Sequence, residues 1–167
     1  MAVLPILTQE APILRQKAKR VPRVDDSIRK LIDDMVDTMV AAPGVGLAAP
    51  QVGVALRVIV IKTDQNLHAL VNPEMVKAEG EQIGMEGCLS VPGYVGEVRR
   101  AMRVVARGLN RMGKPVRIKG DGLLARAIQH EIDHLDGILF TDRLTSLATL
   151  RKVEALEEEE EAELVGA

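Results

Sequence analysis

The sequence has very few aromatic residues and a single cysteine. Among its 167 residues there are one tyrosine, one phenylalanine and no tryptophan. The stacking platforms expected of a protein that binds single-stranded nucleic acid are therefore missing. One cysteine cannot form an internal disulfide, which is typical of a reducing compartment. The core has to be filled by aliphatic side chains and methionine.

Strong net charge and long apolar runs are also missing. The net charge is −2, which gives no electrostatic reason to expect binding to nucleic acid or an anionic membrane. No apolar run approaches the roughly 18 residues of a membrane span. Residues 1–16 contain two prolines and lack the basic and then apolar order of a signal peptide. We expect a monomeric cytoplasmic protein with no direct contact to nucleic acid or membrane.

What is present fits one globular domain. The composition is 47% hydrophobic and 28% charged, as in soluble globular proteins. A chain of this length encloses one sizeable core but hardly two, so we expect residues 1–167 to form a single domain.

Helical spacing of apolar residues predicts three helices. Residues 25–42 carry isoleucine, leucine, methionine and valine at helical intervals and end near a Pro-Gly pair. Residues 122–136 form a second helix, and residues 146–164 a third within an acidic C-terminal tail, 146–167. We expect the run of glutamates in this tail to be a solvent-exposed helix face with no catalytic role.

Strands are expected between the first two helices. The β-branched residues 56–62 predict a buried strand, and turn signals separate further strands at 67–80, 98–109 and 114–122. Regular βαβ alternation is missing, which favours an α+β fold. We expect mostly antiparallel sheets packed around the helix at 122–136, with an N-terminal and a C-terminal helix.

The segment HEIDH, residues 130–134, is an H-E-x-x-H match. On a helix, His134 lies about 40° and Glu131 about 100° from His130, so all three share one side. Two imidazoles one turn apart can bind one metal ion, while the glutamate reaches a metal-bound water. The plainer alternative is two polar residues on a helix flank. The same arithmetic predicts a solvent-facing side formed by Arg126, Gln129 and Asp133.

A catalytic metal site usually has a third protein ligand. The remaining histidine, His68, lies in a strand-like segment, and Asp136 points away from the two histidines on the helix. Cys88 is the preferred candidate, although a lone cysteine is commonly a small buried hydrophobe. Glycine, serine and proline around it, in EGCLSVPGY at 86–94, indicate an ordered turn that could present the thiol.

Three motifs together resemble the peptide deformylases. They are GVGLAAPQVG at 44–53, EGCLS at 86–90 and QHEIDH at 129–134, in the order and spacing of that family. The resemblance implies a hydrolase that removes the N-formyl group from the N-terminal methionine of nascent polypeptides near the ribosome and releases formate. It also implies one divalent ion on Cys88, His130 and His134. Fe²⁺ is preferred, with Zn²⁺, Ni²⁺ or Co²⁺ as alternatives.

The resemblance also assigns catalytic roles. Metal-bound water attacks the formyl carbon, with Glu131 as general base and then general acid. Gln51 and the backbone N–H of Leu89 stabilise the developing oxyanion. A structural ion pair between Glu86 and Arg100 is implied to support the cysteine turn.

Further residues are implied in substrate binding. The main chain of the peptide meets Val45, Gly46 and Gly87, where small residues allow close approach. Leu123 and Ala127 lie beside His130 on the helix and line a pocket for the methionine side chain.

Two other functions are compatible with the H-E-x-x-H motif. A metallopeptidase with H-E-x-x-H would cut internal peptide bonds, and it would more often use a downstream histidine or glutamate as third ligand. A metal-stabilised binding module without catalysis would have no need of Glu131 as a base.

Overall fold

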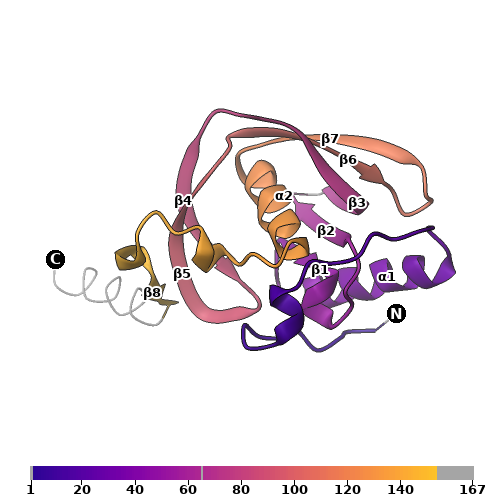
Figure 1. The fold of residues 1–167 in the computed structure, drawn as a ribbon, viewed down its shortest axis with the longest axis horizontal. Helices are drawn as coiled ribbons and strands as arrows, with labels where there is room; N and C mark the ends of the chain where they lie inside the picture. The colour runs from indigo at the N-terminus through magenta and orange to yellow at the C-terminus, as the bar shows by residue number, and fades with distance from the viewer. Residues whose placement is uncertain (1, 65, 154–167) are drawn as a thin grey trace.

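Two α-helices and two antiparallel sheets form an α+β fold over residues 2–64 and 66–153, which the computed structural model describes (Figure 1). The five-stranded sheet has the order β1-β2-β3-β6-β7 and the three-stranded sheet the order β4-β5-β8. The first sheet contains β1 Gly46–Ala48, β2 Val58–Thr63, β3 Asn66–Glu79, β6 Arg103–Leu109 and β7 Pro115–Asp121. The second contains β4 Gln82–Cys88, β5 Val91–Arg100 and β8 Arg151–Lys152. The predicted fold class is thereby confirmed.

Helix α1 spans Asp26–Ala41, close to the predicted 25–42. The Asp25 side chain caps it by accepting a hydrogen bond of 3.1 Å from the Ile28 N–H. Its buried face packs isoleucine and methionine side chains against β1 and β2. The helix ends before Pro43, as the Pro-Gly pair predicts.

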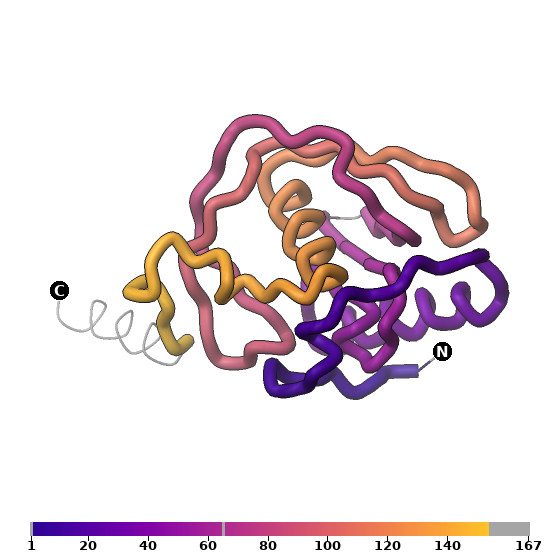
Figure 2. Tube along the Cα trace, viewed as in Figure 1, coloured from indigo at the N-terminus to yellow at the C-terminus, as the bar shows by residue number. Residues whose placement is uncertain are grey.

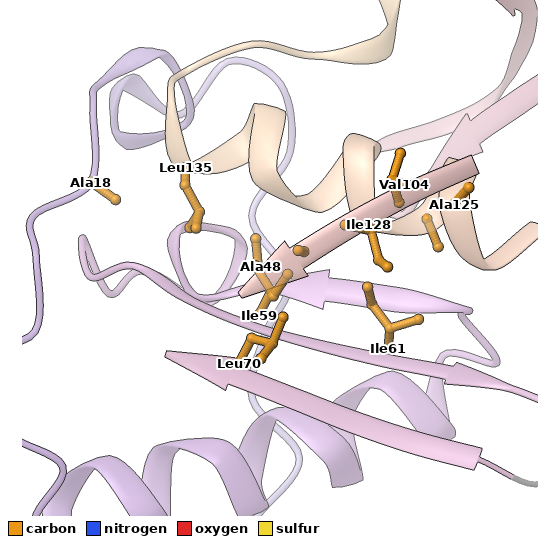
Figure 3. Packing of buried hydrophobic residues seen from close by; sticks show 11 residues of the cluster. Ala18, Ala48, Ile59, Ile61, Leu70, Val104, Ala125, Ile128 and Leu135 are labelled. Carbon is orange, nitrogen blue, oxygen red and sulfur yellow. The ribbon is translucent and has the colours of Figure 1, made fainter. Parts of the chain in front are cut away.

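Helix α2 spans Gly122–Leu135 and lies between the sheets (Figure 1). Its fully buried Ile128 faces Ile59 and Ile61 of β2 in the core cluster of Figure 3. Each such side chain contributes about 1.5–3 kcal/mol when removed from water. This packing fixes the rotation of α2, and therefore the direction in which its polar side chains point.

The N-terminal arm can be followed in Figure 2 along the lower part of the molecule and past the end of α2. Apart from a 3₁₀ turn, η1 at Pro12–Arg15, it is mostly irregular, as predicted. Leu7 N–H donates to the Gln51 carbonyl at 2.7 Å, and Ala18 N–H to the Leu135 carbonyl at 2.8 Å. The arm therefore ties the end of α2 to the segment that carries Gln51.

One local prediction is narrowed and another is wrong. The ordered turn expected within residues 86–94 is limited to residues 89 and 90, because β4 and β5 form a long hairpin on either side of it. No α-helix begins at residue 146: a 3₁₀ turn, η4 Leu147–Thr149, leads into β8, which pairs with Tyr94 and Val95 of β5. Pairing with the hairpin supersedes helix propensity here. The rest of the predicted helix, 154–164, lies outside the described residues.

The glycine-rich segment 44–53 also has regular structure. It contains β1 and a 3₁₀ turn, η2 Ala49–Val52, that ends at Gly53 with φ of 85°. No helix in the described part of the chain is long and apolar enough to cross a membrane.

Candidate metal centre

Three side chains from two elements converge on one point. His130 and His134 lie one turn apart on α2, and Cys88 is the last residue of β4. One ligand atom of each lies within 4.8 Å of those of the other two. The Cys88 Sγ is 3.3 Å from His134 Nε2.

This donor set fits a metal ion. Ligand distances of about 2.3 Å for sulfur and about 2.1 Å for nitrogen allow two ligands of one ion to be at most about 4.4 Å apart. The 3.3 Å between Cys88 Sγ and His134 Nε2 lies within that range. Both histidines are buried, and one thiolate with two imidazoles suits several divalent ions. The residues present therefore fit one metal ion.

The other candidates for the third ligand lie elsewhere. His68 is on β3 opposite Ile61 and is not part of this group. Asp136 accepts a hydrogen bond of 3.0 Å from Arg57 Nη2. Among the residues that the structure describes, Cys88 is the one that completes the pair of histidines.

Glu86 orients His130. Its Oε1 lies 2.7 Å from His130 Nδ1, which donates to it, so Nε2 is the ring nitrogen that can bind a metal once its own proton is displaced. Arg100 donates to Glu86 through Nε at 2.8 Å and Nη2 at 2.9 Å, so the two residues form the expected ion pair, which is buried. Burial opposes ionisation, but the hydrogen bonds from Arg100 and His130 lower the pKa of Glu86 to about 2. Glu86 is therefore a carboxylate at neutral pH.

The two imidazoles differ in their pKa. Burial disfavours the charged form of His130, yet the charge of Glu131 and the hydrogen bonds that His130 makes with Cys88 and Glu86 raise its pKa to about 10. Burial and the charge of His130 lower the pKa of His134 well below its usual value. Neutral His134 therefore offers a free lone pair beside the thiol.

The Glu131 side chain is almost completely buried and lies next to β1. Only 4% of it is exposed, and its Oε1 has no hydrogen-bond partner among the described residues. Burial raises its pKa to about 7, with the charge of His130 opposing the shift. A carboxyl group with a pKa near neutrality can both accept and return a proton.

Gly46 makes room for Glu131. A Cβ at this position would lie 2.5 Å from Glu131 Oε2. The sequence suggested that this glycine is small to admit a ligand. The structure adds a second reason, the close approach of a side chain from α2.

Gln51 points its amide NH₂ toward Cys88. Its Oε1 accepts a hydrogen bond of 2.9 Å from the Ala48 N–H, and its Nε2 donates to Ser90 Oγ at 3.0 Å. The same Nε2 is 3.6 Å from Cys88 Sγ. Because the side chain is 1% exposed and held at both ends, its orientation is fixed. Leu89 follows Cys88 directly, in the connection between β4 and β5.

A cavity of about 490 Å³ opens beside this group. All five residues expected to bind substrate line it: Val45, Gly46, Gly87, Leu123 and Ala127. It is also lined by Gln51, Cys88, Leu89, His130 and Glu131. His134 is the one predicted site residue not in the lining, and it lies behind the others at 1% exposure.

The predicted solvent face of α2 is wrong for two residues. Arg126 and Asp133 are 8% and 9% exposed. Arg126 Nη1 donates to Glu86 Oε2 at 2.6 Å, and Arg100 Nη1 donates to Asp133 at 2.6 Å. The helix pattern alone carries no signal for this, because Glu86 is 40 positions away from Arg126 on another element.

Known proteins resemble the whole chain. The family described as polypeptide deformylase matches residues 3–149. A peptide deformylase from Symbiobacterium thermophilum is 56% identical, covering 98% of this chain and 76% of that protein. One from Thermomicrobium roseum is 52% identical, covering 98% and 97%. A solved peptide deformylase from Legionella pneumophila, 50% identical, has a TM-score of 0.84 over 87% of this chain and 88% of that one. The chain therefore belongs to the peptide deformylase family.

Proposed function

We propose that this hydrolase removes the N-formyl group from the N-terminal methionine of newly made polypeptides and releases formate. One observation carries the proposal: the ligand atoms of Cys88, His130 and His134 lie within 4.8 Å of one another. The buried carboxyl group of Glu131 lines the cavity beside them. The reaction adds one water molecule, breaks the bond between the formyl carbon and nitrogen, and leaves formate and a free amine.

Cys88, His130 and His134 hold one divalent ion in this proposal. Fe²⁺ is the preferred ion, and Zn²⁺, Ni²⁺ and Co²⁺ are alternatives that the same donors accept. When bound, the ion supplies Lewis acidity and lowers the pKa of water. Glu86 supports the arrangement by holding His130 through Nδ1.

Glu131 moves the proton. Its raised pKa, about 7, suits a group that accepts a proton from the attacking water and then gives one to the leaving nitrogen. Glu131 lies between the two histidines in the sequence and belongs to the buried residues of α2, which supports this role. One carboxyl group thus serves as base and acid in turn.

Gln51 and Leu89 stabilise the negative charge that develops on the formyl oxygen. Gln51 Nε2 is already directed at the thiol side of the cavity, and its amide cannot turn without losing the Ala48 contact. The backbone N–H of Leu89 is the second donor. Donors fixed before the reaction need little reorganisation as charge forms.

The cavity receives the start of the peptide. Val45, Gly46 and Gly87 are proposed to contact its main chain, and Leu123 and Ala127 its methionine side chain. Support comes from the shared lining of the cavity by all five residues. Leu123 is 58% exposed and Val45 is 40% exposed, so both are available at the mouth.

The setting is proposed as follows. Residues 1–167 act as a single domain and as a monomer in the cytoplasm, where nascent chains leave the ribosome. The glutamate-rich C-terminal sequence would repel RNA, which favours encounter with the peptide over direct contact with ribosomal RNA.

Formate release is the direct test. Protein purified and loaded with Fe²⁺ without oxygen is mixed with a formyl-Met-Ala-Ser peptide, and formate is measured. Formate is expected in a one-to-one ratio with the new amine. The N-terminally acetylated peptide acetyl-Met-Ala-Ser serves as control for general peptide cleavage. Cleavage of internal peptide bonds, or no formate with one metal per chain, would overturn the proposal.

A further inference from the structure

Arg126 lies between the substrate cavity and the ligands of the metal site. It is one of the cavity-lining residues of α2, between Leu123 and Ala127. Its side chain is 10% exposed, and Nη1 donates to Glu86 Oε2 at 2.6 Å. Arginine commonly uses its methylene stem for packing and its head for polar contacts.

The head of Arg126 is enclosed by the β4–β5 hairpin. Nη1 also lies 3.2 Å from the Val98 carbonyl and 3.5 Å from the Gly84 carbonyl. A Cβ at Gly84 would be 3.2 Å from Nη2, so the small residue leaves space for the guanidinium. The position of the head is therefore tightly defined.

The two oxygens of Glu86 have different partners. Oε1 faces His130 Nδ1 at 2.7 Å and Arg100 Nη2 at 2.9 Å. Oε2 accepts from Arg100 Nε at 2.8 Å and from Arg126 Nη1 at 2.6 Å. Arg126 thus fixes the oxygen that does not touch His130, which leaves the other one aimed at the imidazole.

In the described structure Arg100 pairs with two carboxylates, Glu86 and Asp133, whereas Arg126 pairs with Glu86. Arg100 Nη1 also donates to Asp133 Oδ2 at 2.6 Å, and Arg143 Nε donates to the same oxygen at 2.8 Å. The carboxylate contact found for Arg126 in the described structure is with Glu86. Losing Arg126 would remove one of the two arginines beside a buried carboxylate, and burial makes such a loss costly.

We propose that Arg126 is a positioning residue, which holds Glu86 so that His130 presents Nε2 to the metal, while its stem forms part of the cavity wall. The inference rests on the proposed metal site. It adds to that site a residue that touches neither the metal nor the reacting atoms. Residues that orient a ligand in this way typically change metal affinity or activity by about 10- to 100-fold when lost.

Arg126→Met separates the head from the stem, because methionine keeps an unbranched apolar chain and removes the guanidinium. We expect Co²⁺ to bind about 10-fold or more weakly in this variant, measured by competition with a chelator. The visible absorption bands of bound Co²⁺ should shift, because the imidazole is less well oriented. With metal saturating, kcat should fall, while KM for a formyl-Met peptide stays within about threefold because the stem is replaced.

Arg107→Met is the matched control. Arg107 also pairs with a glutamate, Glu74, but more than half of each side chain is exposed and the pair lies outside the cavity. Its Co²⁺ affinity, spectrum and kcat should equal those of the wild type. Arg126→Lys restores a cation with fewer donors and should recover part of the Co²⁺ affinity lost in Arg126→Met.

The outcomes are distinct. Wild-type Co²⁺ affinity and spectrum in folded Arg126→Met overturn the inference and leave the proposed function intact. If Arg126→Met does not fold, Arg126→Gln takes its place with the same expected losses, and wild-type values there overturn the inference equally. A wild-type chain that binds no Co²⁺ overturns the metal site and this inference together.

Discussion

At the scale of single residues, the site combines groups that would be unstable in isolation. Glu131 is a buried carboxyl group without a hydrogen bond to Oε1 in the described structure, and its pKa is raised to about 7. Such an environment costs stability and is typical of functional carboxyl groups. Glu86, the partner of His130, is instead hydrogen-bonded through both oxygens and has a pKa lowered to about 2. The two carboxyl groups therefore differ in protonation: Glu131 can exchange a proton near neutral pH, whereas Glu86 remains an anion.

Glu131→Gln tests the proton carrier. Glutamine has the same shape but cannot accept the proton, so kcat for deformylation should fall by about 100-fold or more. Metal content should remain that of the wild type, because Glu131 is not in the group of three donors. Formate release over time gives kcat, and elemental analysis gives the metal content. Unchanged turnover in this variant would exclude Glu131 as general base.

At the scale of elements, β1 and α2 approach so closely that a large side chain on α2 requires a small residue opposite it on β1. Gly46 on β1 is opposite Glu131 on α2, and Gly44 just before β1 is opposite Leu89, where a Cβ would lie 2.7 Å from Cδ1. The two glycines thus leave room for the side chains of Glu131 and Leu89, which come from other segments. The glycine-rich segment is therefore a packing requirement, in addition to its proposed contact with the peptide.

Gly46→Ala should displace the Glu131 carboxyl group. The added methyl group would meet Oε2 at 2.5 Å, so the side chain has to turn away from its position. A shift of about 1 Å in a catalytic group can cost about 100-fold in rate. We expect a large decrease in kcat with unchanged metal content. A variant that loses metal, or one that keeps the wild-type kcat, would contradict this account of Gly46.

Helix α1 holds the N-terminal arm through Asp34. The carboxyl group accepts hydrogen bonds of 2.8 Å from Lys30 Nζ and from the Ala2 N–H. The bond from Lys30, with a smaller contribution from Ala2, holds the pKa of Asp34 below its usual value. A pKa that is lower in the folded than in the unfolded state stabilises the fold above the unfolded value, about 3.9.

Asp34→Asn should therefore lower stability in a pH-dependent way. At pH 7 the urea midpoint of the variant should be below that of the wild type. The difference should start to shrink as the pH falls below about 4, where the carboxyl group of the unfolded wild type becomes protonated, and should vanish once the folded carboxylate is protonated at lower pH. Urea unfolding at pH 7, 5 and 3.5 measures this. A difference that grows toward low pH would reverse the sign and contradict the assignment.

At the scale of the whole molecule, α2 is the shared wall of two sheets. Its apolar side packs on the five-stranded sheet, and its polar residues meet the β4–β5 hairpin. The hairpin brings Glu86 and Cys88 to the histidines across more than 40 positions of sequence. Neither sheet alone contains the site, which forms when α2 is enclosed between them.

Periodicity in the sequence predicts the two helices well, because both bury an apolar stripe. The α+β class follows from the lack of βαβ alternation, and the three donors follow from the motifs. The hairpin around Cys88 escapes prediction, since Gly87, Pro92 and Gly93 obscure the alternation expected of strands. Its strands are defined by long-range pairing that no local pattern contains.

The buried charges of α2 could not be predicted for a related reason. A helical wheel gives angles but not partners, so Arg126 and Asp133 were assigned to solvent. In the fold, both are covered and paired with residues from the hairpin or from the segment after α2. A charged residue on an apparently polar face can be buried whenever another element brings the opposite charge.

The central claim is that Cys88, His130 and His134 hold one metal ion. The most direct measurement is elemental analysis of protein purified without oxygen, for the wild type and for Cys88→Ala, with circular dichroism to confirm that both fold. We predict about one divalent ion per wild-type chain, as expected for a single three-ligand site, and far less in Cys88→Ala. Equal metal content in the folded variant and the wild type would contradict the claim.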